Sequence, residues 1–373
     1  MALVMGKKPN GETLDYNDGI TDGADQIVGN AGVDHIYAGG GQDIIKGGGG
    51  ADYIDGGANR DGVTYEDSGV GVEVSLVAGK GKGGTAEGDT LVSIEDVYGS
   101  TYDDKLVGNS KDNLLSGGDG NDVLKGGGGA DILKGGAGND VMEIDGVDDR
   151  TCGGDGIDTL VANSTQGLKI NLNSGFVDTN PWGNAAAGHY GAGAEYGWGP
   201  GYSPHAPGTP ENVTDVENVI GSNYDDAIHG NELANNLFGG NGDDLLSGLA
   251  GDDVIGGGAG DDIIYGGLGA DWLTGGADSD TFKFSSADAS QMVNGKPQDV
   301  ITDFQHGYDT IDLSTFDIAL NDLLEIDNQN IDGANCALVG IDANHNGQFD
   351  AGEFAVAVKM AAGATLHASD FIF

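Results

Sequence analysis

Aspartates recur at a spacing of nine residues in three stretches of this 373-residue chain. The first run consists of Asp25, Asp34, Asp43, Asp52 and Asp61, and glycine-rich segments such as GGGGAD precede them. Glycine accepts positive φ, so a glycine-rich turn can point its backbone carbonyls toward one place. Aspartate adds a carboxylate oxygen, and calcium takes about six to eight oxygen ligands of both kinds. The spacing therefore predicts a calcium-binding turn in each nonapeptide.

Two further runs keep this spacing, although the frames around Asn113 and Asp149 are poor matches. The frames around Asp122 and Asp131, GGDGNDVLK and GGGGADILK, are nearly ideal. The second run is Asp104, Asn113, Asp122, Asp131, Asp140, Asp149 and Asp158, and the third is Asp226, Asn235, Asp244, Asp253, Asp262, Asp271 and Asp280. The predicted calcium ligands in the repeats are Asp25, Asp34, Asp43, Asp52, Asp61, Asp104, Asp122, Asp131, Asp140, Asp158, Asp226, Asp244, Asp253, Asp262, Asp271 and Asp280.

Except at Asp149, each aspartate of the three runs is followed two residues later by an apolar side chain. This predicts a strand of two or three residues with that side chain pointing inward. Examples are Ile45, Ile54, Leu124, Leu133, Leu246, Ile255, Ile264 and Leu273. One aliphatic side chain per nonapeptide makes a narrow core that cannot repay the chain entropy lost on folding. Metal binding must contribute, so folding and calcium binding become one equilibrium.

At these repeats, which fit G-G-x-G-x-D-x-U-x with U a large aliphatic residue, the chain resembles the RTX, or hemolysin-type, calcium-binding proteins. The resemblance implies an all-β fold, a right-handed parallel β-roll with two nonapeptides in each coil. Asp25 would then stack over Asp43 and Asp61, and Asp34 over Asp52 on the opposite side. Multiple Ca²⁺ ions would be the cofactor, each between two turns that are 18 residues apart.

The composition limits the possible partners. The chain has 72 glycines, and 61 acidic against 15 basic residues give a net charge of −46. Nucleic acid is excluded as a partner because a phosphate backbone requires Lys and Arg. No apolar run is long enough to span a membrane. Only Cys152 and Cys336 occur, which is no disulfide framework.

The run boundaries and the segments between them predict seven parts. They are an N-terminal lead-in (1–19), roll block 1 (20–64), a β insert (65–98), roll block 2 (99–161), an aromatic and glycine-rich insert (162–220), roll block 3 (221–283) and a C-terminal β capping domain (284–373). In the first insert Val72, Val74 and Leu76 alternate with other residues, which predicts a half-buried strand that continues the parallel sheet.

The second insert concentrates aromatic residues between 176 and 210. Aromatic side chains on a loop often bind sugar rings or another protein, and they also fold onto a roll as a cover. Both interpretations stay open. The candidate ligand-binding residues are Trp182, His189, Tyr190, Tyr196, Trp198 and Tyr202.

The last quarter resembles the C-terminal domain of the serralysin metalloproteases in GGADSDTFKF, ITDFQHGYDTIDL and the terminal DFIF. In that family an acid followed by three apolar residues at the end belongs to an uncleaved type I export signal, so the resemblance implies the type I secretion machinery as a partner.

Within the last quarter, the loop 342–353 places oxygen donors at the spacing of an EF-hand loop, although strand-like segments flank it. We expect a calcium-binding hairpin loop, with a plain Asx-rich turn as the alternative. Its candidate ligands are Asp342, Asn344, Asn346, Asp350 and Glu353.

These features predict a secreted extracellular calcium-binding protein, acting at the cell surface or in the matrix. One alternative is a calcium-dependent adhesin that binds extracellular polysaccharide or cell-surface glycan through the aromatic insert. Another is the roll and export portion of a larger secreted hydrolase or epimerase. The sequence contains no H-E-x-x-H and no G-x-S-x-G, and we expect no catalytic activity and no catalytic residues.

Overall fold

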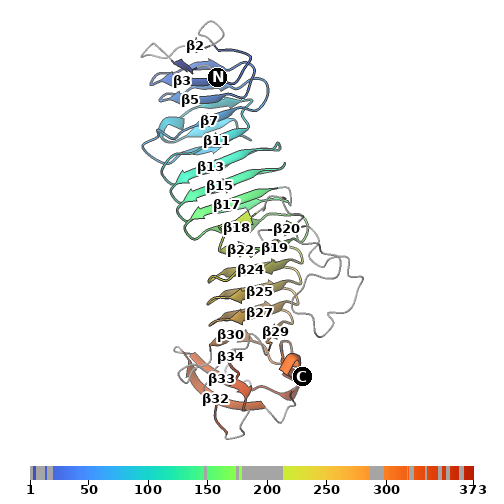
Figure 1. The fold of residues 1–373 in the computed structure, drawn as a ribbon. Coiled ribbons are helices and arrows are strands. Elements are labelled where there is room, and N and C mark those ends of the chain that lie inside the picture. The colour runs from blue at the N-terminus through green and yellow to red at the C-terminus, as the bar shows by residue number, and fades with distance from the viewer. Residues whose placement is uncertain are drawn as a thin grey trace. The chain divides into compact units, whose positions relative to one another are not determined.

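The computed structural model describes residues 3–5, 13–14, 20–146, 149–173, 176–178, 213–285, 298–316, 318, 323–331, 334–342, 347–349, 353–360 and 365–373. Nearly all of their regular structure is β-strand (Figure 1). The chain forms two compact units, residues 1–163 with 212–216 and residues 164–211 with 217–373. Within the described residues, no helix is long and apolar enough to cross a membrane.

The first unit contains two sheets, and successive nonapeptides contribute their strands to the two sheets alternately. One sheet is parallel and runs in the order β1 (Leu3–Met5), β3 (Gln26–Asn30), β5 (Ile44–Gly48), β7 (Gly62–Thr64), β11 (Asp96–Tyr98), β13 (Leu114–Asp119), β15 (Ile132–Ala137), β17 (Arg150–Asp155) and β21 (Val213–Thr214). The other contains β2 (Thr13–Leu14), β4 (His35–Tyr37), β6 (Tyr53–Asp55), β8 (Glu73–Ser75), β9 (Lys80–Lys82), β10 (Thr90–Val92), β12 (Lys105–Val107), β14 (Val123–Lys125), β16 (Val141–Ile144) and β18 (Thr159–Ala162).

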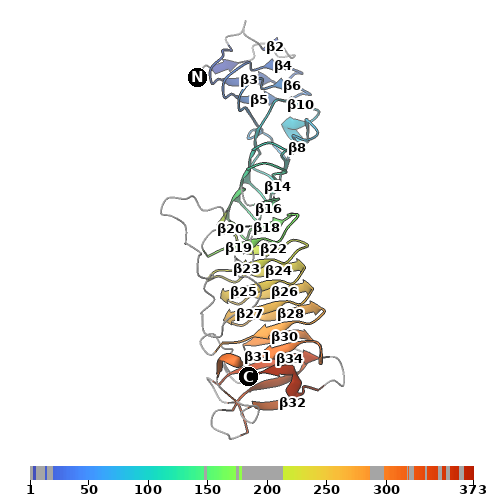
Figure 2. The ribbon, with the colours of Figure 1, turned by 90° about the vertical axis from the view of Figure 1, so that its right-hand side faces the viewer.

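The second unit repeats this plan, as Figure 2 shows for its two rows of strands. One sheet has the order β20 (Phe176–Asp178), β19 (Lys169–Asn171), β23 (Ala227–His229), β25 (Leu245–Ala250), β27 (Ile263–Leu268), β29 (Thr281–Lys283), β31 (Thr310–Asp312) and β35 (Phe371–Ile372). The other contains β22 (Asn218–Ile220), β24 (Asn236–Asn241), β26 (Val254–Ala259), β28 (Trp272–Ala277), β30 (Asp299–Phe304), β32 (Leu323–Ile331), β33 (Ala334–Ile341) and β34 (Ala355–Met360). Short 3₁₀ helices lie at Gly84–Ala86, Ser314–Phe316 and Ala368–Asp370.

The strands pair in parallel with partners 18 residues away, for example Leu115 with Leu133 and Ile255 with Leu273. Two nonapeptides therefore make one coil, which confirms the predicted parallel β-roll. Several strands have six residues rather than the two or three expected. In β13 and β15 the pairing continues through the first glycines of the next turn, such as Gly118 with Gly136, because those glycines have no side chain to hold neighbouring coils apart.

The first insert continues the sheets, as the alternation of Val72 and Val74 predicted. β8 pairs in parallel with β12, and β10 pairs in parallel with β6. The hairpin between them, β8–β9–β10, is antiparallel and widens the coil. The nonapeptide spacing stops near Phe284, but the roll does not, because β30 pairs with β28 and β31 with β29.

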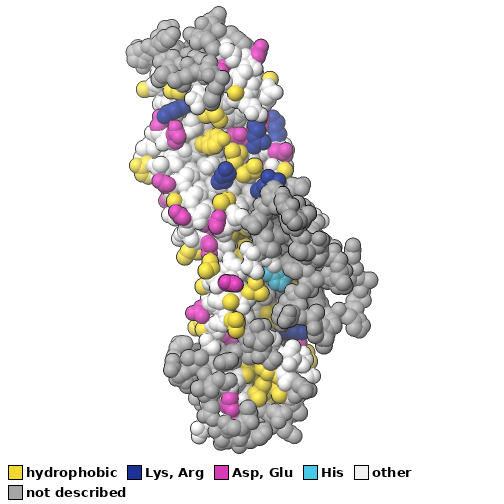
Figure 3. Space-filling view, viewed as in Figure 1, with side chains coloured by type: hydrophobic (Ala, Val, Ile, Leu, Met, Phe, Trp, Pro, Cys, Tyr) yellow, Lys and Arg dark blue, Asp and Glu magenta, His cyan; other side chains and the backbone are white. Residues whose placement is uncertain are grey.

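The core is the predicted ladder of single apolar side chains. Ile45, Leu124, Leu246 and Ile255 are representative, and each is fully buried. The repeat aspartates are also buried, in the turns. On the face drawn in Figure 3, the described acidic side chains form separate magenta spots rather than a continuous acidic stripe.

The ladder allows a matched stability test within strand β26. Ile255 is fully buried, whereas the side chain of its neighbour Val254 is 50% exposed. We expect Ile255→Ala to lower the free energy of unfolding in saturating calcium by about 2–5 kcal/mol, because it leaves a cavity in a core one side chain wide. Val254→Ala should cost less than about 1 kcal/mol. Urea denaturation of both variants measures the difference, and equal losses would contradict this assignment of the core.

Candidate metal centres

The repeat aspartates form stacks that follow the coils. The backbone N–H of Asp104 donates to Oδ1 of Asp122 at 2.7 Å, and Asp122 N–H donates to Oδ1 of Asp140 at 2.7 Å. In the second unit Asp244 N–H donates to Oδ1 of Asp262 at 2.8 Å. The predicted stacks of Asp25 on Asp43, Asp43 on Asp61 and Asp34 on Asp52 are present, with distances of 2.7–2.9 Å. One oxygen of each of these carboxylates is therefore held by a backbone N–H of the neighbouring coil.

The second oxygen of many of these carboxylates is buried and accepts no hydrogen bond. This is the case for Oδ2 of Asp43, Asp52, Asp61, Asp122, Asp131, Asp140, Asp244, Asp253, Asp262, Asp271 and Asp280. A buried carboxylate oxygen without a partner is costly, and it is the hard ligand that calcium prefers. The residues present therefore fit calcium.

The turn backbone leaves no room for side chains beside these oxygens. In the turn before Asp122, Gly118 and Gly120 have φ of 121° and 123°. A Cβ atom on Gly118 would overlap the carbonyl oxygen of Ser100, and one on Gly117 would overlap Oδ2 of Asp122. The glycines therefore place backbone close to the free oxygen, where carbonyl ligands are needed.

Across the described residues, no group of three or more His, Cys, Asp and Glu side chains is arranged to hold a metal ion. The repeat offers one carboxylate in each turn, so most ligands of a bound ion would have to be backbone carbonyls of glycine-rich turns. Calcium accepts such mixed sets of oxygen ligands.

Burial raises the pKa of many of the carboxyl groups in these stacks above the ordinary value of 3.8. The pKa is raised to about 7 for Asp52 and Asp122 and to about 8 for Asp244. Desolvation is the main cause. The backbone hydrogen bond from the preceding coil acts in the opposite direction, and neighbouring carboxylates such as Asp262 beside Asp244 add to the rise. Without a cation, the ionised forms are strongly disfavoured in the folded roll.

The stacks also contain acids that lie outside the nonapeptide runs and that the spacing did not predict. Asp52 N–H donates to Asp89 Oδ1 at 2.8 Å, and Asp61 N–H donates to Glu95 Oε2 at 3.2 Å. The stacks continue to Asp299 and Asp309, which accept the N–H groups of Asp271 and Asp280. The signal for all of them is an acid two residues before a buried apolar residue, as in Asp-Thr-Leu at 89–91 and Asp-Val-Ile at 299–301, without the glycines.

At two of these acids, a side chain of the protein contacts the carboxylate oxygen that a cation would otherwise bind. The Tyr65 hydroxyl donates to Asp89 Oδ2 at 3.1 Å inside the first unit. Lys111 Nζ lies 2.8 Å from Glu95 Oε1. The carboxylates of Asp89 and Glu95 are therefore satisfied from within the protein.

The poorly matching frames also join the stacks. Asn113 N–H donates to Asp131 Oδ1 at 2.7 Å, and Asp131 N–H donates to Asp149 Oδ1 at 2.9 Å. Register is therefore kept where the local sequence departs from the repeat, because neighbouring coils impose it.

The C-terminal loop forms part of a hairpin. Strands β33 and β34 flank it and pair antiparallel, as expected, so no two-helix EF-hand is formed. Gly347 N–H donates to Asp342 Oδ2 at 2.7 Å, and Gly347 has φ of 80°. Glu353 is half-buried. The predicted ligands Asn344, Asn346 and Asp350 lie outside the described residues, so the calcium loop stays a prediction.

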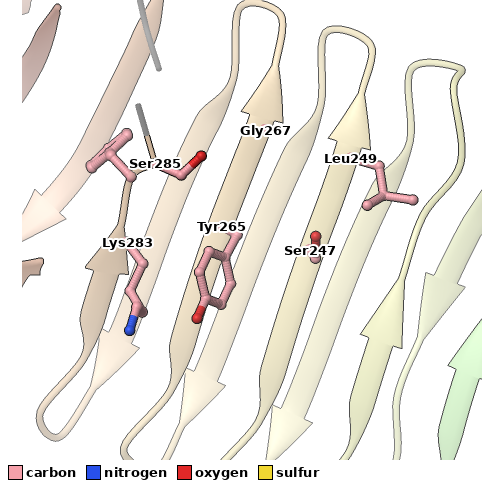
Figure 4. A pocket seen from close by; sticks show the side chains of 7 residues that line it. Ser247, Leu249, Tyr265, Gly267, Lys283 and Ser285 are labelled. Atoms are coloured by element: carbon pink, nitrogen blue, oxygen red, sulfur yellow. The ribbon is translucent and has the colours of Figure 1, made fainter. Parts of the chain in front are cut away.

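The predicted ligand-binding aromatic residues also lie outside the described part of the chain, namely Trp182, His189, Tyr190, Tyr196, Trp198 and Tyr202. Among the described residues, a shallow hollow of about 70 Å³ lies on the sheet of β25, β27 and β29 (Figure 4). Lys283 Nζ lies over the Tyr265 ring at 5.7 Å and pairs with Asp312 at 2.7 Å. The hollow has room for only about two waters. The ammonium group of Lys283, which lines it, is already paired with Asp312.

The raised pKa values predict opposite effects of pH with and without calcium. In the unfolded chain these groups ionise near their ordinary value, whereas in the metal-free roll Asp122 and Asp244 keep their protons to about pH 7 and 8. Folding of the metal-free chain is therefore most favourable at acidic pH and becomes less favourable as pH rises from about 4 to about 8. With calcium, acidification should instead weaken binding, because protons compete for the same oxygens.

Far-UV circular dichroism of metal-free and calcium-loaded protein between pH 5 and pH 8 measures both effects. Metal-free protein should gain β-structure on acidification, while calcium-loaded protein should need more calcium to fold. A metal-free chain that folds better at pH 8 than at pH 5 would contradict the electrostatic assignment.

Comparison with known proteins agrees with this geometry. The family model described as the RTX calcium-binding nonapeptide repeat matches residues 20–54, 28–63, 98–133, 107–142 and 116–150. The model described as the peptidase M10 serralysin C-terminal domain matches residues 212–372. A search of curated proteins finds no match to this chain.

Two solved structures are similar in part. They are the solution structures of the AlgE6R3 and AlgE6R2 subunits of the mannuronan C5-epimerase from Azotobacter vinelandii, each 28% identical to this chain with a TM-score of 0.23. The matches cover 46% and 41% of this chain, and 86% and 90% of the respective subunits. From the two family models and the stacked turns we conclude that the chain is an RTX calcium-binding repeat protein that carries a serralysin-type C-terminal domain.

Proposed function

We propose that this protein is a secreted, non-catalytic calcium-binding protein that folds when calcium binds its turns outside the cell, and that acts at the cell surface or in the matrix. The observation that carries the proposal is the set of buried carboxylate oxygens without a hydrogen bond, as in Asp122, Asp131 and Asp140. These oxygens lie in consecutive turns, so each bound ion would also lie next to another site.

The core of the roll is only one apolar side chain thick in each nonapeptide. A ladder of single aliphatic side chains offsets little of the conformational entropy lost on folding. The stacked carboxylates add desolvation and mutual repulsion, which is why the pKa of Asp244 is raised to about 8. Calcium would supply the missing positive charge at each free oxygen, and its binding free energy would then become folding free energy. The ligands would be Oδ2 of the aspartate and carbonyls of the glycine-rich turns.

The C-terminal segment supports export as the route to that calcium. Asp370 is buried, and His306 Nδ1 lies 2.8 Å from its Oδ1. Strand β35 pairs with β31, and Leu313 N–H donates to the Ile372 carbonyl at 2.8 Å. In the folded unit the terminal residues are therefore engaged. A secretion machine that reads them would have to do so before folding, as happens if folding waits for extracellular calcium.

Calcium dependence of folding tests the proposal. We expect the chelated chain at pH 7.5 to give a far-UV circular dichroism spectrum of a largely unfolded chain, and millimolar calcium to produce a β-rich spectrum. Magnesium at the same concentration serves as the matched control and should have little effect, because it demands near-ideal octahedral geometry and dehydrates reluctantly. An equally folded chelated sample would overturn the proposal.

A further inference from the structure

The turn at Asp149 lies partly outside the described residues, and in it the N–H of Asp145 donates to Asp149 Oδ2 at 3.1 Å. The other turns of the three aspartate runs are of two kinds, which differ at their second residue. Counting the acid as the sixth residue of its turn, the second residue lies four positions before it. In one kind, here called the open turn, the second residue has positive φ. In the other, the closed turn, it is Ser, Thr or Asn, and its side chain and backbone N–H both make hydrogen bonds within the turn.

Ser222 shows the closed arrangement in the second unit. Its N–H donates to Asp226 Oδ2 at 2.6 Å, and its hydroxyl accepts the N–H of Tyr224 at 3.2 Å. The other oxygen, Oδ1 of Asp226, accepts the N–H of Leu168. Both carboxylate oxygens of this turn are therefore already hydrogen-bonded to the protein.

Ser100 repeats the arrangement in the first unit. Its N–H donates to Asp104 Oδ2, its hydroxyl donates to Asp104 Oδ1 at 2.8 Å, and Tyr102 N–H donates to that hydroxyl at 3.1 Å. In every closed turn the second residue donates its N–H to the sixth, and its side-chain oxygen accepts the N–H of the fourth. The second residues are Thr21, Asn30, Ser100, Asn109, Ser222 and Asn231.

The open turns lack this pair of hydrogen bonds. Their second residues have positive φ, and those with φ between 77° and 125° include Gly39, Gly48, Gly57, Gly118, Gly127, Gly136, Gly240, Leu249, Gly258, Gly267 and Gly276. The acid four positions after each of them is one whose buried Oδ2 accepts no hydrogen bond. Leu249 is informative, because it has φ of 77° without being glycine, and Asp253 after it has the free oxygen. Backbone conformation rather than glycine itself thus distinguishes the two kinds.

Closed turns occupy a fixed place in the chain. Each run begins with two of them, at Asp25 and Asp34, at Asp104 and Asn113, and at Asp226 and Asn235. Two nonapeptides make one coil, so each run starts with one complete closed coil. At two closed turns the acid is replaced by the neutral Asn113 and Asn235, whose Oδ1 still accepts the N–H of the second residue. The acid in all of the open turns is aspartate.

We propose that the conformation of the second residue selects which turns bind calcium: open turns bind it through the free carboxylate oxygen, and the closed coil that begins each run binds none through its acids. This inference rests on the proposed calcium-binding function and assigns its sites. The closed coil satisfies its carboxylates with N–H and hydroxyl donors, so it needs no cation. It is an end piece on which the first calcium-binding coil stacks, as Asp226 N–H donating to Asp244 Oδ1 at 2.7 Å shows.

Matched substitutions of one closed and one open turn test the assignment. Asp226→Asn removes the charge of a closed turn, and Asn235 is the natural precedent for that change. Asp244→Asn makes the same change in the open turn 18 residues later. Bound calcium is measured on the full chain by equilibrium dialysis and atomic emission, with folding checked by far-UV circular dichroism in calcium. Asp104→Asn and Asp122→Asn provide a second pair in the first unit.

We expect Asp244→Asn to lower the bound calcium by about one ion per chain and Asp226→Asn to leave it unchanged. Equal losses from both substitutions would overturn the selection by turn type while leaving calcium binding by the roll intact. No loss from either would overturn the assignment of calcium to the repeat carboxylates, and with it the proposed function. The three outcomes are therefore distinguishable.

Converting a closed turn into an open one tests the proposal without removing a carboxylate. Combining Ser222→Gly with Tyr224→Gly changes the closed turn at Asp226 into the pattern G-G-x-G-x-D of an open turn. Both glycines can adopt positive φ, which removes the donor N–H from Asp226 Oδ2. We expect about one additional calcium ion per chain relative to the unchanged protein, and an unchanged number in a folded variant would contradict the proposal.

Discussion

The structure depends on one unfavourable arrangement: a carboxylate oxygen that is buried in a turn and accepts no hydrogen bond. Oδ1 of Asp122 is fixed by the N–H of Asp104, and Oδ2 of Asp122 has no hydrogen-bond partner. The arrangement recurs in successive coils, so the cost accumulates along each roll. A cation at the free oxygen would relieve both the desolvation and the repulsion between stacked acids. Metal binding and folding are therefore one event in this account, and a small core suffices.

The two kinds of turn explain how such a stack begins. An open turn leaves a buried carboxylate oxygen without a hydrogen bond, which a cation would satisfy. A roll made only of open turns would therefore have no end whose carboxylates are all hydrogen-bonded. The closed coils at the start of each run use the hydroxyls of Ser100 and Ser222 and the amides of Asn109 and Asn231 to complete their own hydrogen bonding. Tyr65 and Lys111 serve the same purpose at Asp89 and Glu95 of the first insert. Calcium dependence is thus concentrated in the glycine-rich coils.

Most of the fold was predictable, because each nonapeptide encodes both its turn and its inward side chain. The repeat pattern predicted that Leu124 and Ile255 point inward, and the resemblance to RTX repeats implied that Asp25 stacks on Asp43. Asp89 and Asp299 were missed because they join their stacks from loops without the repeat glycines, where only the coil above fixes the register. The difference between Asp226 and Asp244 could not be predicted from the acids themselves, since it depends on the backbone conformation four residues earlier.

The most direct test of the central claim is a calcium titration of the chelated protein in which bound calcium and far-UV circular dichroism are recorded on the same samples. If ions bind only as the coils that hold them form, the two curves should coincide and rise cooperatively. The contradicting result is a chain that reaches its full β-structure signal before calcium binds, or that binds calcium at the same turns without gaining β-structure. Either separation would mean that the free oxygens of Asp122 and Asp244 do not control folding.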